Sequence, residues 1–161
     1  MKDTLEHIIK NELGWNWSYG RRDFQNLEEP EAADDPKPFF FMDPPVREDE
    51  RSSDSGLKTG WTKVSGKFMI LLKSDLDQNY DQQKGQAKED GKFDKHIKPV
   101  IEDKLDSNGE VVEHALINQL ENIISCPPYD WHIKAQRVQE VINLFDNNYD
   151  GALVTFSWRL R

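Results

Sequence analysis

The last seventeen residues, 145–161, constrain the fold more than any other part of the chain. Their sequence, FDNNYDGALVTFSWRLR, opens with Asp, Asn and Gly residues, which tolerate the tight or left-handed backbone of a turn. Apolar residues then alternate with polar ones at Val154, Phe156, Trp158 and Leu160. This period of two, built from β-branched and aromatic residues, predicts a strand with one buried face. A strand at a chain end is ordered when it is tied into a sheet.

Residues 61–73, WTKVSGKFMILLK, are the natural partner of that strand. Val64, Phe68 and Ile70 share one face with Gly66 and Leu72, and Met69 and Leu71 make the second half apolar on the other face as well. A strand that is apolar on both faces belongs at the centre of a sheet.

Two further segments are predicted to be strands. Residues 38–42, PFFFM, form a short apolar run between prolines, and residues 129–137, YDWHIKAQR, alternate through Trp131 and Ile133. Residues 138–145 fit either a strand or a helical turn, and the aromatic row WNWSY at 15–19 fits either a brief strand or a loop.

Three segments have helical periodicity. Residues 3–13 place four apolar side chains on one stripe, and residues 111–125 give the clearest pattern. A further stripe over 93–105 consists of Phe93, Ile97, Val100, Ile101 and Leu105, and because Pro99 lies within it, that helix either begins near Lys98 or kinks there. The side chains expected to face inward from the helix over 111–125 are Val112, Ala115, Leu116, Leu120, Ile123 and Ile124. The chain is therefore predicted to be one α/β (α+β) domain, 1–161, with a mostly antiparallel four-stranded sheet packed by an N-terminal helix and two central helices.

The remaining segments are polar. Residues 28–37 are acidic, residues 82–92 carry two glycines, and residues 46–60, VREDERSSDSGLKTG, have almost no apolar side chains. We predict that 46–60 is an exposed loop, either a projecting arm or a disordered segment, because it has too little apolar surface to order itself by burial.

The net charge is −9, with a pI of about 4.9. Such a surface does not attract nucleic acid or an anionic membrane. Cys126 is the single cysteine, which fits a reducing compartment, and the amphipathic, charged N-terminal segment does not have the pattern of a signal peptide. These features predict a protein that is soluble inside a cell or is assembled there.

No pattern in the chain indicates catalysis, and we expect neither a cofactor nor a metal. Phosphate-binding and dinucleotide-binding glycine motifs, paired cysteine or histidine ligands and a nucleophile elbow are all missing from the sequence. Two Asp-rich stretches, 75–81 and 146–151, imitate the start of a calcium loop, but their twelfth positions are Gln86 and Ser157 instead of Glu. Turn formation or helix capping explains both stretches.

The order of elements resembles that of phage neck proteins of the tail terminator and tail completion type. The likeness lies in PFFFMDP at 38–44, KFMILL at 67–72 leading into SDL, and FDNNYDG at 145–151 before the closing strand. The resemblance implies an α/β fold whose copies form a ring, commonly of six. Such a ring caps the tail tube, meets the head connector and lets genome DNA pass without specific binding. The chain would then be a virion protein, assembled in the host cytoplasm.

In an assembly of this kind we expect the subunit interface to use the polar segment after residue 46 and the end of the closing strand. The expected residues are Arg47, Glu48, Asp49, Glu50, Arg51, Arg159 and Arg161. Two alternatives stay open: another neck or connector ring protein, and a small non-viral enzyme or binding module. A monomer with a well-formed polar cleft would favour the enzyme or binding module.

We predict that neither Asp-rich stretch binds calcium tightly, because each lacks the bidentate carboxylate at its twelfth position. Titration calorimetry of the full chain with calcium should show no micromolar site. A micromolar affinity that is lost in Asp150→Ala would overturn this prediction.

Overall fold

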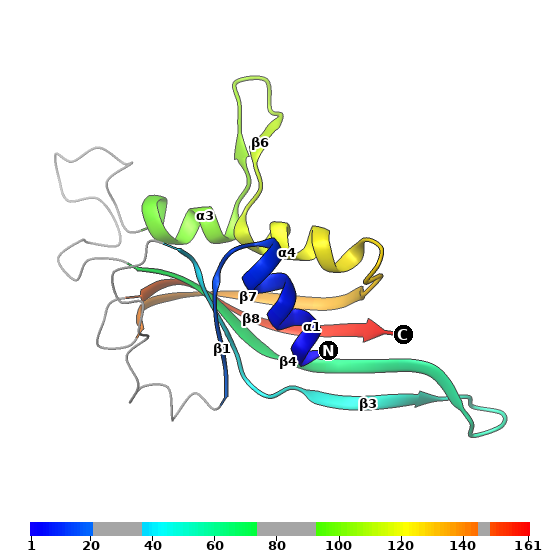
Figure 1. The fold of residues 1–161 in the computed structure, drawn as a ribbon. Helices are drawn as coiled ribbons and strands as arrows, with labels where there is room; N and C mark the ends of the chain where they lie inside the picture. The colour runs from blue at the N-terminus through cyan, green and yellow to red at the C-terminus, as the bar shows by residue number, and fades with distance from the viewer. Residues whose placement is uncertain (21–36, 74–92, 145–148) are drawn as a thin grey trace, which may run out of the picture.

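The computed structural model describes residues 1–20, 37–73, 93–144 and 149–161. Within these ranges a curved, mixed sheet carries helices on one face, and two hairpins project from the body (Figure 1). The acidic stretch 28–37 except its last residue, the Asp-rich stretch 75–81, residues 82–92 and residues 145–148 of the turn lie outside the described residues.

The sheet has six strands in the order β1-β2-β4-β8-β7, with β3 also paired to β4. Their bounds are β1 Asn16–Tyr19, β2 Phe39–Met42, β3 Val46–Arg51, β4 Lys58–Lys73, β7 His132–Leu144 and β8 Tyr149–Leu160. All pairings are antiparallel except that of β1 with β2. The mixed α+β class and the mostly antiparallel sheet are confirmed, whereas the prediction of four strands is wrong.

The two extra strands have different causes. β1 is the aromatic row whose form the sequence left open, and Trp17 in it stacks on Phe40 with ring centroids 5.4 Å apart. β3 lies in the segment 46–60, predicted to be a loop. β3 is a strand because β4 extends beyond the core, where its backbone groups can pair with a neighbouring strand. Backbone hydrogen bonds of this kind do not require apolar side chains.

The ladder between β4 and β8 forms the middle of the sheet. It is continuous from Thr62 opposite Leu160 to Lys73 opposite Tyr149. At Gly151 the two backbones come so close that an added Cβ would overlap the carbonyl oxygen of Ile70, so only glycine fits there.

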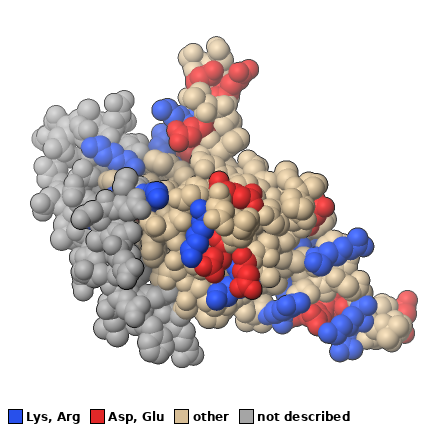
Figure 2. Space-filling model, viewed as in Figure 1, with Lys and Arg blue, Asp and Glu red and all other residues tan. Residues whose placement is uncertain are grey.

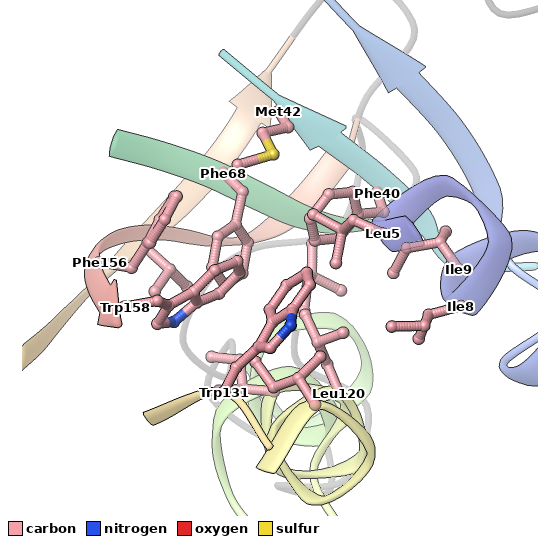
Figure 3. Close-up of a cluster of buried hydrophobic side chains, with 14 of the residues drawn as sticks. Leu5, Ile8, Ile9, Phe40, Met42, Phe68, Leu120, Trp131, Phe156 and Trp158 are labelled. Carbon is pink, nitrogen blue, oxygen red and sulfur yellow. The ribbon is translucent and has the colours of Figure 1, made fainter. Parts of the chain in front are cut away.

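The main core lies between this ladder and the helices (Figure 3). Trp158 of β8 is 2% exposed, and its ring centroid lies 4.0 Å from that of Phe156, 5.6 Å from that of Trp131 and 5.8 Å from that of Phe68. A smaller apolar cluster of Phe39, Phe41, Met69, Leu71 and Tyr149 is buried on the other face. The central position predicted for residues 61–73 is therefore confirmed.

Three helical segments cover the main core. α1 Lys2–His7 continues as the π-helical turn η1 Ile8–Glu12, a second π-helical turn η3 Phe93–Ile97 leads into α3 Lys98–Ile101, and α4 spans Leu116–Ser125. Leu5, Val100 and Leu120 each insert a fully buried side chain into the core. In the described ranges no helix is long and apolar enough to span a membrane.

The two central helices are shorter than predicted. The helix expected over 93–105 ends at Ile101, and the one expected over 111–125 begins at Leu116. Between them a hairpin is formed by β5 Lys104–Leu105 and β6 Val111–Glu113. The β-branched pair Val111-Val112 and the turn at 106–109 favour this hairpin over helix. Leu105 and Val112, expected to face inward, are 56% and 64% exposed.

We predict that Trp158→Ala strongly destabilises the chain. Truncation of a buried aromatic leaves a cavity that costs about 3–5 kcal/mol, a large share of the roughly 5–15 kcal/mol that stabilises a domain. Denaturant unfolding should give this loss for Trp158→Ala and almost none for Thr155→Ala, an exposed position on the same strand. Equal stability of the two variants would contradict the core assignment.

Candidate interaction surface

A long β-hairpin, which we call the arm, extends from the body of the protein (Figure 1). It consists of β3 and the first part of β4, joined by a turn in which the Ser52 amide donates to the Leu57 carbonyl oxygen at 2.8 Å. Two large apolar side chains are exposed on it, Val46 at its start (63%) and Leu57 in the turn (69%). Of the two forms that the sequence left open, the structure therefore has the projecting arm.

The charged side chains of the arm pair across its two strands. The Lys58 ammonium lies 2.5 Å from Asp49, and that of Lys63 lies 3.6 Å from Glu48. The hydrogen bond from Lys58 lowers the pKa of the Asp49 carboxyl below its ordinary value. Arg51 donates to the carbonyl oxygen of Gly56 at 3.1 Å. Figure 2 shows Lys and Arg interleaved with Asp and Glu along the arm.

At the root of the arm the structure brings three of the predicted interface residues together. Arg159 lies 2.6 Å from the carboxylate of Glu50, and its guanidinium stacks over the Trp61 ring at 4.4 Å. Arg161 lies over the same ring at 4.8 Å. The sequence analysis did not identify Trp61 as a site residue. A signal was present, because Trp61 shares a strand face with Lys63, and an aromatic side chain on that face lies outside the core.

A groove of about 510 Å³ lies beside this root, where the chain's first and last residues meet. Its floor is apolar, formed by the buried side chains of Val64, Trp131 and Leu160. Lys2, Arg47 and Arg161 contribute positive charge around it, and no acidic residue is among the described residues that line it. We call this the terminal groove. It contains two of the predicted interface residues, Arg47 and Arg161.

The β5–β6 hairpin is the second projection and stands out from the body beside α3 and α4 (Figure 1). Its turn is closed by Asp106, whose carboxylate accepts from the backbone amides of Asn108 at 2.8 Å and Glu110 at 2.9 Å. Leu105, Val111 and Val112 are exposed on its strands. Figure 2 shows acidic side chains near its free end.

Asp103 fixes the root of this hairpin. Its Oδ1 accepts from the Ala115 amide at 2.6 Å and from the Asn118 side chain at 2.9 Å, so it joins the segment before β5 to the start of α4. These hydrogen bonds lower the pKa of the Asp103 carboxyl, and the one from the Ala115 amide has the largest effect. The neighbouring His114 also lowers this pKa. The hairpin is therefore held at both of its ends.

Exposed apolar side chains gather on the two projections. Among the described residues, the large hydrophobic side chains that are exposed are Val46, Leu57, Leu105, Val111, Val112 and Val138. All except Val138 belong to the arm or the hairpin. Leu105, Val111 and Val112 are neighbours on the hairpin, and neighbouring exposed apolar side chains mark surfaces where another molecule binds.

The residues with possible chemistry do not converge. Asp130, His132 and Lys134 border a second, shallower cavity of about 380 Å³, with Asp130 as its only carboxylate among the described residues. Across the described ranges, no three His, Cys, Asp or Glu side chains are grouped so that they could hold a metal ion. Comparison with protein-family models, curated proteins and solved structures found no match for the chain.

We predict that Asp103→Asn destabilises the chain at neutral pH, because it removes the carboxylate that anchors α4 and the hairpin. The pKa of Asp103 is lowered in the folded state, so its contribution is present above the ordinary value of 3.8 and is lost as the pH falls through the folded value. Urea unfolding should therefore show a difference from the parent at neutral pH that shrinks in acid. Glu102→Gln, an exposed neighbour, is the control, and a difference independent of pH would contradict the assignment.

Proposed function

We propose that this chain is a structural virion protein of the phage head–tail neck, a ring-forming tail terminator that caps the tail tube and joins it to the head connector. The observation that carries the proposal is the concentration of exposed apolar side chains on two ordered projections. The likeness of the strand and turn segments to tail terminator and tail completion proteins is the reason for proposing a phage neck as the assembly.

The body of the protein supports an assembly role for the projections. The main core is closed by residues of the body and does not use the five exposed apolar side chains of the arm and hairpin. A projection that does not build its own core is free to contact a neighbour. Because the arm and hairpin leave the body in different directions (Figure 1), contacts made through them join different surfaces of successive copies. Such head-to-tail contacts close into rings when the rotation between copies permits.

In this proposal the ring has about six copies and binds the tail tube protein on one side and head connector proteins on the other. Arg47, Glu48, Asp49, Glu50 and Arg51 are on the arm, while Arg159 and Arg161 are at its root, and they contribute to contacts between subunits. The net charge of −9 disfavours adhesion of genome DNA that passes through the ring.

We predict that replacing both exposed apolar residues of the arm, Val46→Ser with Leu57→Ser, impairs ring formation without loss of folding. Exposed substitutions usually change stability by no more than about 0.5 kcal/mol, so the thermal midpoint should stay near that of the parent. Val138→Ser, an exposed valine outside both projections, is the matched control. Assembly onto tails, scored by sedimentation, should fail only for the double variant, and an equal defect in the control would count against the arm.

Imaging tests the identity of the assembly. Electron microscopy of tailed particles that contain the chain, labelled with an antibody fragment, should place it as a closed ring at the junction of head and tail. A position away from the head–tail axis would refute the proposed function.

A further inference from the structure

We infer that the terminal groove binds the β5–β6 hairpin of a second copy of this chain. The inference specifies the contact between neighbouring subunits, and it rests on the proposed function of a ring. Each of the two surfaces carries the features that the other needs.

The first of these features is charge. Lys2, Arg47 and Arg161 give the terminal groove positive charge in a protein whose net charge is −9. The hairpin carries the opposite sign, because Asp106, Glu110 and Glu113 outnumber its one cation, Lys104, and all four are exposed. Opposite potentials on two surfaces favour their association and fix its orientation.

The groove's arginines keep their positive charge available. Among the described residues Arg47 has two contacts, both long, 3.5 Å to the Thr62 hydroxyl and 3.9 Å to Asp49, and its side chain is 70% exposed. Arg161 is exposed, and its guanidinium lies over the Trp61 ring, a contact that does not neutralise its charge with a carboxylate. A carboxylate from outside can therefore pair with either guanidinium without breaking a strong internal ion pair.

The second feature is apolar surface. Leu105 and Val111 lie opposite each other on the two strands of the hairpin and are both exposed. The groove offers the half-buried side chains of Met1, Tyr19 and Pro45 as a surface for such side chains. Apolar side chains with cations around them thus match a hairpin with apolar strands and acidic side chains, and docking would remove the exposed part of both apolar surfaces from water.

The hairpin cannot reach the groove of its own chain. Asp103 holds its root against the start of α4, and the hairpin points away from the body, whereas the groove lies at the chain termini beside the arm (Figure 1). The contact must therefore join two copies through two different surfaces, and its repetition builds a ring or a filament.

Directed crosslinking tests this contact. In a Cys126→Ser background, one chain carries Ser107→Cys in the hairpin turn and the other carries Thr4→Cys in the groove. Mixed under mild oxidation at high concentration, or on assembled tails, the two chains should form a disulfide-linked pair. Thr155→Cys on the opposite face of the sheet is the matched control and should give none with Ser107→Cys.

Charge exchange makes the test specific. Arg47→Glu in the groove chain, or Glu110→Lys in the hairpin chain, should each lower the yield of the crosslink several-fold. Combining the two variant chains should restore the crosslink yield, because the ion pair between positions 47 and 110 is then present with its charges exchanged. Thermal melts show whether each variant folds. If Arg47→Glu does not fold, Lys2→Glu replaces it as the groove variant.

Three outcomes would overturn the inference: crosslinking to the control position, crosslinking insensitive to both charge variants, and a groove cysteine that links only to a different protein on tails. The test of this contact can be separated from the test of the proposed function. If the crosslink forms but the chain is not at the head–tail junction, the contact is supported and the proposed function is refuted. If the chain forms a ring at the junction without the crosslink, the proposed function is supported and the contact is refuted.

Discussion

The antiparallel ladder between β4 and β8 is the interaction on which the rest of the structure depends. Its twelve register pairs bring the closing strand against the centre of the sheet and align Phe68, Phe156 and Trp158 on one face. The helices then have an aromatic surface to pack on, and Trp131 joins α4 to it. Without the close approach at Gly151 the two backbones could not keep this register.

The projections follow from the same ladder. β4 has sixteen residues, and none of its first six, Lys58–Lys63, is buried. These residues pair with β3 beyond the core, so the arm is a continuation of the central strand and has the same direction. Ion pairs across the arm are exposed and individually weak, but the backbone pairing does not depend on them. The hairpin is anchored differently, by the Asp103 carboxylate at the start of α4.

The sequence predicted the parts of the fold that bury apolar side chains. Alternation identified β4, β7 and β8, and the helical stripe identified α1, because burial on one face leaves a period in the sequence. A fully apolar run between prolines identified β2. It could not identify β3, whose six residues are stabilised by pairing to a neighbour and contain one apolar side chain. Likewise, Val111 and Val112 fit the helical pattern of the residues after them, and only the turn at 106–109 could have separated them. Of the candidate site, the sequence indicated Arg47 and Arg161 but not the groove, which requires the termini to meet.

We propose that neighbouring copies cover the exposed apolar side chains of the arm and the hairpin. Amide hydrogen exchange, compared between the free chain and the chain assembled on tails, tests it most directly. We expect assembly to increase protection at residues 46–59 and 104–113, while β8 is already protected in the free chain. Unchanged exchange in both projections, with new protection confined to other surfaces, would contradict it.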